Sequence, residues 1–240
     1  MKSFSTYGTG IPRLDLAELS GWLIVIEGTD GVGRTTHINL LRQHLEELGY
    51  AVAETGLSRS DLASRGIRRA KQGNTLGSNA FNLFYATDFA DRLERQIVPA
   101  LRSGFVMITD RYIYSLIARA IVRGADPDWI RRVYSFSLKP DAVFYLRIDT
   151  EDLVPRVLQQ GGFDYWESGM DIPMGEDHYE SFIRYQRRVI EELDRLSRDF
   201  SFDTIDATQE VDEIADYVSE RVSALLEGAA PAADAIAARP

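Results

Sequence analysis

The segment Gly28-Thr29-Asp30-Gly31-Val32-Gly33-Arg34-Thr35-Thr36 constrains the fold of this chain more than any other part of its sequence. The first and last glycines of the segment and the hydroxyl group of Thr35 have the spacing of the pattern G-x-x-x-x-G-K-[ST], a phosphate-binding loop between a buried strand and a helix. The apolar run 22–26 is typical of a strand buried on both faces, and apolar residues between 38 and 48 recur at helical spacing. The sequence therefore predicts a strand, a glycine loop and a helix in succession.

The residue types of this segment suit the binding of a polyphosphate. Consecutive backbone N–H groups in such a loop, together with the positive end of the following helix, attract anionic oxygens. Glycine lets the backbone approach these oxygens closely. The hydroxyl oxygen of Thr35 is a ligand of the kind that Mg²⁺ prefers.

Arg34 stands where the pattern has lysine. Its guanidinium group keeps the positive charge but is a wider, planar fork, so the exchange is not conservative in a tight cradle. Two interpretations remain open at this point: a kinase adapted to arginine, and a nucleotide-binding protein with weakened catalysis. We favour the first, because other groups suited to phosphoryl transfer are present.

Composition restricts the classes of protein that need to be considered. The chain has 240 residues, of which 45% are hydrophobic, and this suits a single domain with a full core. The absence of cysteine from the sequence excludes disulfides and cysteine-based sites. A formal net charge of −10 disfavours binding to nucleic acid, and no apolar stretch is long enough for a signal core or a membrane span. We therefore expect a soluble, cytoplasmic protein with no nucleic acid or membrane partner.

Short apolar runs alternate with helical segments along the rest of the chain. Strands are expected at 22–26, 50–54, 105–109, 142–148 and 202–206. Helices are expected at about 79–102, 112–123, 126–136, 151–160, 176–198 and 210–227. This alternation predicts an α/β fold with three layers, α/β/α, in which a five-stranded parallel sheet has helices on both faces and binds ligands at the carboxyl edge of its strands.

A second polar motif follows the third predicted strand. Asp110, Arg111 and Tyr112 stand at the end of that strand, and Ser115 lies three positions further. A carboxylate there can hold the water ligands of a metal ion, and an adjacent arginine can bind a phosphate with two hydrogen bonds. Alone, Asp110 and Arg111 would be interpreted as a helix cap beside a solvated arginine. The glycine loop predicted at the same edge favours the functional interpretation.

These motifs resemble those of the thymidylate kinases, which are nucleoside-monophosphate kinases of the P-loop NTPase fold. Residues 28–36 resemble the family's E-G-x-D-G-x-G-K-[ST]-T loop, and residues 110–115 resemble its D-R-[YF]-x-x-S motif. Residues 83–86 are similar to the L-L-F-A stretch whose aromatic ring stacks on thymine, and residues 139–156 and 205–211 are similar to two further motifs. The resemblance covers about Leu23 to Val222.

The resemblance implies a role for each matching residue, with ATP and Mg²⁺ as cofactors. The implied catalytic residues are Arg34, Arg111 and Asp30, and the implied metal ligands are Thr35 and Asp110. The implied ATP-binding residues are Gly28, Thr29, Asp30, Gly31, Val32, Gly33, Arg34, Thr35, Thr36 and Ala207. The implied acceptor-binding residues are Asp30, Tyr85, Phe89, Arg92, Arg111, Tyr112, Ser115, Arg119 and Tyr165.

The resemblance also implies an organisation of the chain and a set of partners. We expect an N-terminal extension at 1–20, a kinase domain at 21–228 with a lid at about 157–175, and a disordered tail at 229–240. Whether the extension packs on the domain or is mobile is left open. The expected partners are small-molecule nucleotides and a second copy of the chain in a homodimer.

Departures from the family pattern concern the acceptor. Phe89 stands where the family has an arginine that contacts the pyrimidine, and Ala118-Arg119-Ala120 replaces A-Y-Q. The lid region 159–174 contains no arginine, and its Tyr165-Trp166 pair either covers a base or anchors the loop. The expected reaction is dTMP + ATP to dTDP + ADP. The alternatives are a kinase of the same fold with another nucleotide, a nucleoside or a phosphorylated metabolite as acceptor, and a catalytically weak nucleotide-binding regulatory protein.

Overall fold

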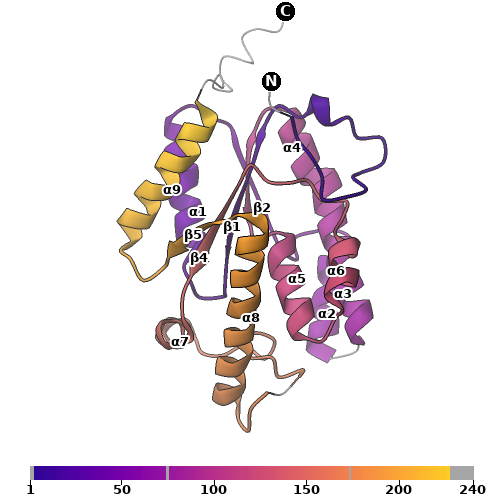
Figure 1. Ribbon diagram of the computed structural model, residues 1–240, viewed down its shortest axis with the longest axis vertical. Helices are drawn as coiled ribbons and strands as arrows, with labels where there is room; N and C mark the ends of the chain where they lie inside the picture. Colours follow the sequence, from indigo (N-terminus) through magenta and orange to yellow (C-terminus); the bar gives the residue numbers. More distant parts are fainter. Residues whose placement is uncertain (1–2, 74–75, 173, 228–240) are drawn as a thin grey trace, which may run out of the picture.

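The computed structural model describes residues 3–73, 76–172 and 174–227. At its centre lies a five-stranded parallel sheet with the strand order β2-β3-β1-β4-β5. The strands are β1 (Trp22–Gly28), β2 (Val52–Gly56), β3 (Val106–Asp110), β4 (Ala142–Arg147) and β5 (Asp203–Asp206). Figure 1 shows helices on both sides of this sheet. The predicted fold class is confirmed.

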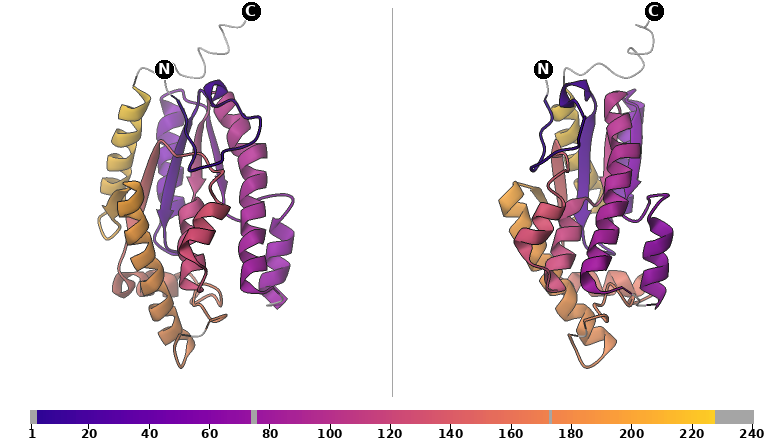
Figure 2. Two further views of the ribbon diagram at one scale, coloured as in Figure 1. Left: turned by 45° about the vertical axis from the view of Figure 1, so that its right-hand side comes forward. Right: turned by 90° about the vertical axis from the view of Figure 1, so that its right-hand side faces the viewer.

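Successive apolar side chains of β1 point to opposite faces of the sheet, so both faces have to be covered. Leu23 and Val25 point into one apolar cluster, and Ile24 and Ile26 point into the other. All four side chains are fully buried. The first cluster is covered by α3 (Ser78–Arg92), α5 (Ile113–Val122) and α8 (His178–Phe200), and the second by α1 (Arg34–Glu47) and α9 (Val211–Leu226). The side views in Figure 2 show the sheet between these layers.

The remaining helices complete the covering layers. They are η1 (Leu16–Glu18), α2 (Ser64–Gly73), η2 (Leu93–Ile97), α4 (Val98–Arg102), α6 (Pro127–Val133) and α7 (Thr150–Gln159). The single helix expected at 79–102 consists of α3, the π-helical segment η2 and α4 in direct succession. α2 was not predicted. Its buried apolar positions are only Ile67 and Ala70, and arginines surround them in the sequence.

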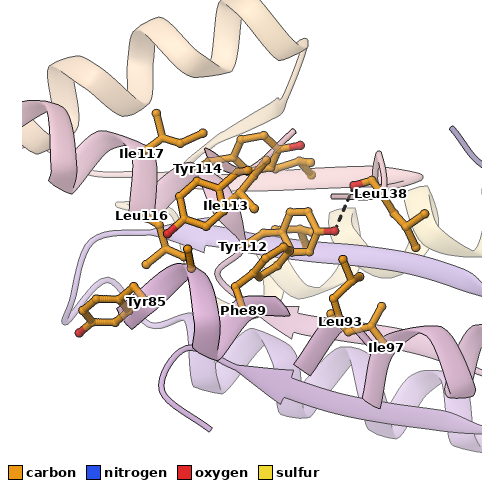
Figure 3. Close-up of a cluster of buried hydrophobic side chains, with 14 of the residues drawn as sticks. Tyr85, Phe89, Leu93, Ile97, Tyr112, Ile113, Tyr114, Leu116, Ile117 and Leu138 are labelled. Atoms are coloured by element: carbon orange, nitrogen blue, oxygen red, sulfur yellow. Dashed lines mark hydrogen bonds between the residues drawn. The ribbon is translucent and has the colours of Figure 1, made fainter. Parts of the chain in front are cut away.

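The segment before β1 packs on the domain. Phe4 is buried, and Thr6 forms an isolated antiparallel bridge with Leu138. The hydroxyl groups of Tyr7 and Tyr114 lie 2.6 Å apart. Figure 3 shows Tyr114 and Leu138 within the apolar cluster of the helical layer. The described part of the extension is therefore packed, whereas Met1, Lys2 and the expected tail 229–240 lie outside the described residues.

The sheet brings the two polar motifs together at its carboxyl edge. β1 lies between β3 and β4, and Ile26 is paired with Asp110 in the parallel register. The glycine loop therefore begins two residues beyond the position of Asp110 on the neighbouring strand. Within the described ranges, no helix is both long and apolar enough to cross a membrane.

Candidate active site

The glycine loop adopts a conformation that only glycine accepts easily. Gly28, Gly31 and Gly33 have φ angles of 149°, 81° and 107°. A Cβ atom at Gly28 would lie 2.9 Å from the carbonyl oxygen of Leu146, so the loop also depends on close backbone packing. The loop leads into α1, whose first N–H groups have no acceptor within the helix. These donors and the positive end of the helix favour an anion at this position.

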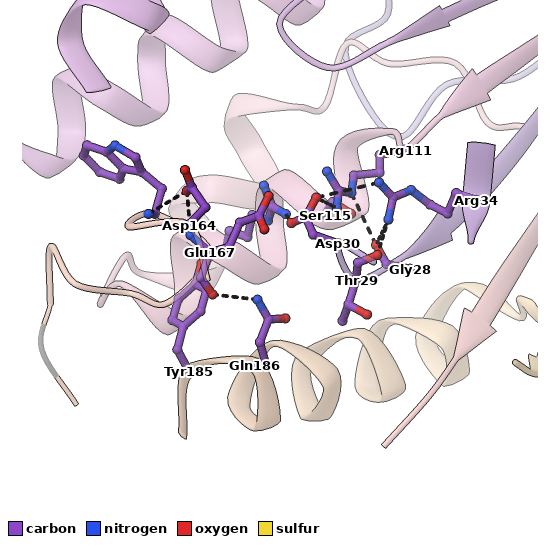
Figure 4. Close-up of polar contacts among 12 residues, drawn as sticks. Gly28, Thr29, Asp30, Arg34, Arg111, Ser115, Asp164, Glu167, Tyr185 and Gln186 are labelled. Atoms are coloured by element: carbon purple, nitrogen blue, oxygen red, sulfur yellow. Dashed lines mark hydrogen bonds and ion pairs between the residues drawn. The ribbon is translucent and has the colours of Figure 1, made fainter. Parts of the chain in front are cut away.

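Arg34 lies beneath the loop and is about nine-tenths buried. Its Nη1 donates to the carbonyl oxygens of Gly28, at 2.9 Å, and Thr29. Its Nε donates to Oδ1 of Asp110 at 2.6 Å. The guanidinium group therefore connects the loop to the end of β3, and the fork geometry of arginine allows both contacts at once. Figure 4 shows the side chain turned toward the loop.

Asp110 and Arg111 are fixed by the end of β3. The N–H of Arg111 donates to the carbonyl oxygen of Ile26 at 2.9 Å, and Arg111 has a φ of 67°, which is unusual for a residue other than glycine. Although burial raises the pKa of Asp110, the charges of Arg34 and Arg111 outweigh it, and the pKa is below its usual value. Asp110 is therefore ionised at neutral pH. Its carboxylate and the hydroxyl of Thr35, an exposed residue, are oxygen groups of the kind that Mg²⁺ prefers.

Asp30 lies between two arginines. Its Oδ1 accepts from Arg111 and its Oδ2 accepts from Arg119 of α5. These charges hold the pKa of Asp30 far below its usual value despite its burial. Burial and repulsion by Arg34 lower the pKa of Arg111 to about 10, which still leaves it protonated at neutral pH. The cluster thus holds three arginines around two carboxylates, an excess of positive charge suited to phosphate groups.

Glu27 positions the second motif from beneath. It is fully buried, and its Oε1 accepts from the backbone N–H groups of Tyr112, at 2.9 Å, and Ser115, at 3.3 Å. The hydroxyl of Ser115 donates to its Oε2. Burial raises the pKa of Glu27, although these hydrogen bonds oppose the rise. Glu27 was not predicted as a site residue, although the acidic residue before the first glycine belongs to the family motif.

A cavity of about 160 Å³ opens beside the arginine cluster. It reaches from Asp30 and Arg111 at the carboxyl edge of the sheet to the helices α2, α3 and α5 and the segment between α7 and α8. The lining residues are Asp30, Leu57, Ser58, Lys71, Phe81, Asn82, Tyr85, Arg111, Leu116, Arg119, Ala120, Arg123, Tyr134, Trp166 and Glu167. Of the nine predicted acceptor-binding residues, the cavity is lined by Asp30, Tyr85, Arg111 and Arg119.

The structure places Phe89 and Arg92 in the core, and neither side chain lines the cavity, so their predicted contact with the acceptor stays a prediction. Both side chains are fully buried, and the guanidinium group of Arg92 lies 5.6 Å from the Phe89 ring. Arg92 donates through Nε to Asp88, which accepts from the backbone N–H groups of Ser58 and Ser60. Arg92 therefore supports the loop after β2 and does not reach the cavity.

Three more predicted acceptor-binding residues do not line this cavity. Tyr112 is fully buried and donates its hydroxyl to the carbonyl oxygen of Leu138, as Figure 3 shows. Ser115 is engaged by Glu27. Tyr165 is 42% exposed and faces a neighbouring surface pocket with Arg68. We therefore do not propose direct acceptor contacts for these three side chains.

Ala207 lies directly after β5 and is linked to the glycine loop by Arg156, a residue of α7. Arg156 donates to the carbonyl oxygens of Val32, at 3.2 Å, and Ala207, at 2.8 Å. One side chain thus joins Val32 and Ala207, two residues that are far apart in the sequence and are both predicted to bind ATP. Arg156 is the last residue of the stretch 139–156 that resembles a family motif, but it was not predicted as a site residue.

Glu167 enters the cavity from the segment between α7 and α8. Its backbone carbonyl accepts from Gln186 at 2.7 Å, a hydrogen bond drawn in Figure 4. Burial and the charge of Asp30 raise the pKa of Glu167 to about 7, although Arg119 and Arg111 oppose the rise. An ionisable group thus faces the arginine cluster across the cavity. The only sequence signal for it was an acidic residue in a lid region without arginine.

Comparison with known proteins points to one family. The family model described as "Thymidylate kinase" matches residues 26–218. "Probable thymidylate kinase 2" of Saccharolobus solfataricus is 39% identical over 199 residues, which are 82% of this chain and 92% of the relative. "Probable thymidylate kinase" of Pyrococcus horikoshii is 34% identical over 60% of this chain and 73% of the relative. The protein of the same description from Thermococcus kodakarensis is 29% identical over 85% of this chain and 98% of the relative.

Proposed function

The chain belongs to the thymidylate kinase family of nucleoside-monophosphate kinases, and we propose that it transfers the γ-phosphoryl group of ATP to dTMP, giving dTDP and ADP. One observation carries this proposal. The arginine cluster of Arg34, Arg111 and Arg119 lies between the glycine loop and a cavity lined by the aromatic residue Tyr85. A donor polyphosphate in the loop and an acceptor phosphate in the cavity would therefore meet at these positive charges.

Positioning and charge are the main contributions that this arrangement offers to phosphoryl transfer. Arg34 would hold the transferring group from the side of the loop, and Arg111 would bind the acceptor phosphate. Asp30 orients Arg111 and Arg119 through one hydrogen bond to each. Because these donors are fixed before the reaction, they stabilise developing negative charge without reorganisation.

The donor set also fits Mg²⁺, which would be held by Thr35 and Asp110. Both side chains offer oxygen atoms, and the low pKa of Asp110 keeps it in the form that binds a cation. A cation held there would offset the negative charge of the phosphate groups during transfer. The buried hydroxyl of Thr29 has no partner among the described residues, so the loop retains a polar group for the nucleotide.

Initial rates with ATP and a panel of acceptors test the proposal. We expect dTMP to be used, and we expect weaker discrimination against dUMP and dCMP than the family pattern implies, because the arginine and the glutamine of that pattern are replaced in this chain. Phe89 stands in the core where the family has an arginine, and Ala120 stands where it has a glutamine. Stacking on Tyr85 tolerates any base. A lack of turnover with dTMP, dUMP, dCMP, dAMP and dGMP would contradict the proposal.

Two alternatives remain, each with its own supporting observation. The buried Phe89 and the alanine at 120 support a kinase with another nucleotide, a nucleoside or a phosphorylated metabolite as acceptor. The hydrogen bonds of Arg34 to its own loop support a catalytically weak nucleotide-binding regulatory protein. Turnover of an acceptor outside the monophosphate panel would favour the first, and ATP binding without any transfer would favour the second.

The proposal extends to location and assembly. We propose that the protein acts in the cytoplasm on free nucleotides and that two copies form a homodimer. Three large apolar side chains on or beside α2 and α3 are exposed, namely Leu62 at 69%, Leu83 at 48% and Phe84 at 39%. Exposed apolar side chains of this size support an interface, since water would otherwise surround them.

A further inference from the structure

An aromatic wall forms one side of the acceptor cavity. It consists of Trp166 from the segment between α7 and α8 and of Phe81 and Tyr85 from α3, and all three residues line the cavity. The rings of Trp166 and Phe81 are stacked, with centroids 5.0 Å apart and an interplanar angle of 22°. Phe81 in turn meets Tyr85 edge-on at 5.1 Å. The wall therefore joins the predicted lid region to the helix that carries the predicted stacking residue.

The position of Trp166 is fixed by hydrogen bonds from three directions. Its backbone N–H donates to Oδ1 of Asp164 at 2.8 Å, and its indole Nε1 donates to the carbonyl oxygen of Lys71 at 3.1 Å. Its carbonyl oxygen accepts from Nη2 of Arg123 at 2.9 Å. The ammonium of Lys71 and the guanidinium of Arg123 lie 5.9 Å and 6.0 Å from the centre of the ring. Cation–π attraction between these two groups and the indole restrains the ring further.

Anchoring alone does not account for this residue. The indole is only half-buried and lines both the cavity and the neighbouring surface pocket, whereas Tyr165 is exposed and lines only that surface pocket. Residues 159–174 contain no arginine that would reach the phosphates of ATP. The segment therefore presents an aromatic surface and the carboxyl group of Glu167 to the acceptor side, and offers no positive charge to the donor.

We propose that Trp166 is an acceptor-binding residue whose indole, with Phe81 and Tyr85, packs against the base of the nucleoside monophosphate. This inference rests on the proposed function, because it requires that the cavity holds the acceptor. Stacking on one aromatic ring changes the affinity for a base by about fivefold to a hundredfold. The cavity, at about 160 Å³, is smaller than typical small-molecule sites of about 300 Å³ or more.

Intrinsic fluorescence tests this contact directly, because Trp166 is one of only three tryptophans in the chain. Trp22 begins β1 and lies six residues, or about 20 Å, from the glycine loop, and Trp129 lies on α6. Neither lines the cavity. We expect titration with dTMP to change the emission of the wild type and of Trp129→Phe, and not of Trp166→Phe. ATP alone should change the emission little. A change that persists in Trp166→Phe, or no change in the wild type with any monophosphate of the panel, would overturn the inference.

Steady-state kinetics supply the second measurement. Trp166→Ala should raise the KM for the acceptor by about tenfold to a hundredfold and leave the KM for ATP within about twofold. Trp166→Phe should have a smaller effect, because its ring can keep the contact with Phe81. Tyr179→Ala is the matched control, since this half-exposed ring contacts the lid region at Phe163 but does not line the cavity.

The outcomes separate this inference from the proposed function. An equal rise in both KM values, or no rise in either, would show that Trp166 only supports the fold. If Trp166→Ala does not fold, the fluorescence and KM values of Trp166→Phe decide. If no monophosphate is phosphorylated, the proposed function fails, yet a Trp166-dependent fluorescence response to a monophosphate would still establish binding at the wall.

Discussion

Arg34 determines whether this loop supports catalysis. Its guanidinium group reaches the carbonyl oxygens of Gly28 and Thr29 and the carboxylate of Asp110, so it stands where donor phosphate and metal would meet. We expect Arg34→Ala to lower kcat by about a hundredfold to a thousandfold, the usual cost of losing a group that stabilises transition-state charge, while the Kd for ATP changes less. Single-turnover rates and nucleotide titrations measure the two quantities.

Arg34→Lys is the control for this prediction. It keeps the positive charge in a compact ammonium group, so we expect it to retain or raise activity. Circular dichroism should give the same folded signal for both variants. Equal kcat values for the wild type and Arg34→Ala would show that this side chain supports the loop but takes no part in transfer.

Glu167 should make acceptor binding dependent on pH. Burial and the charge of Asp30 raise its pKa to about 7, so the carboxyl group is mostly neutral at pH 6 and mostly ionised at pH 8. Ionisation adds negative charge opposite the arginines that would bind the acceptor phosphate, namely Arg111 and Arg119. We therefore expect the KM for the acceptor to rise by about threefold to tenfold from pH 6 to pH 8. Initial rates at several pH values measure it.

The variant Glu167→Gln separates this effect from titration of the substrate. The second ionisation of the acceptor phosphate, with a pKa near 6, is common to both proteins, so the ratio of their KM values isolates Glu167. We expect the ratio of the wild-type KM to the KM of Glu167→Gln to be constant below pH 6. Above pH 7 we expect this ratio to rise, because only the wild type gains a negative charge there. A constant ratio across the range would exclude the ionisation of Glu167 as a determinant of acceptor binding.

At the scale of elements, the sequence predicted what depends on local pattern. β1, the glycine loop and α1 each have a local signal: an apolar run, a spaced motif and a 3.6-residue repeat. Which side chains reach the cavity depends on tertiary packing, and the local sequence pattern carries no information about that packing. Tyr85 and Phe89 are one turn apart on α3, yet only Tyr85 lines the cavity. Trp166 and Tyr165 are adjacent in a segment without periodicity, so their directions could not be predicted.

The contribution of the extension before β1 to the stability of the fold can be measured. Phe4 is 5% exposed, and the hydroxyl of Tyr7 bonds that of Tyr114 in the helical layer. We expect Phe4→Ala to lower the free energy of unfolding by about 3 kcal/mol through a cavity, and Tyr7→Phe to lower it by about 1 kcal/mol through one lost hydrogen bond. Denaturant unfolding measures both. Wild-type stability for Phe4→Ala would mean that the segment does not pack in solution.

At the scale of the whole molecule, we propose that a second copy of the chain covers the exposed apolar side chains near the acceptor cavity. This surface consists of Leu62, Leu83 and Phe84 on or beside α2 and α3. Its position is informative, because α3 also carries Tyr85, which lines the acceptor cavity. Packing of two copies through α3 would remove the exposed rings from water and restrain the helix that holds the aromatic wall.

Light scattering during size-exclusion chromatography tests this assembly. We expect the wild type to have twice the chain mass of 27.1 kDa and Leu83→Glu to have the mass of one chain. Burying an unpaired carboxylate in the interface would cost more free energy than the apolar contacts contribute. Leu48→Glu is the matched control, since Leu48 is 47% exposed but lies at the end of α1, away from this surface. The variant Leu83→Glu should also bind the acceptor more weakly, as α3 loses its restraint. A wild type with the mass of one chain, or a dimer that persists in Leu83→Glu, would place the interface elsewhere or exclude it.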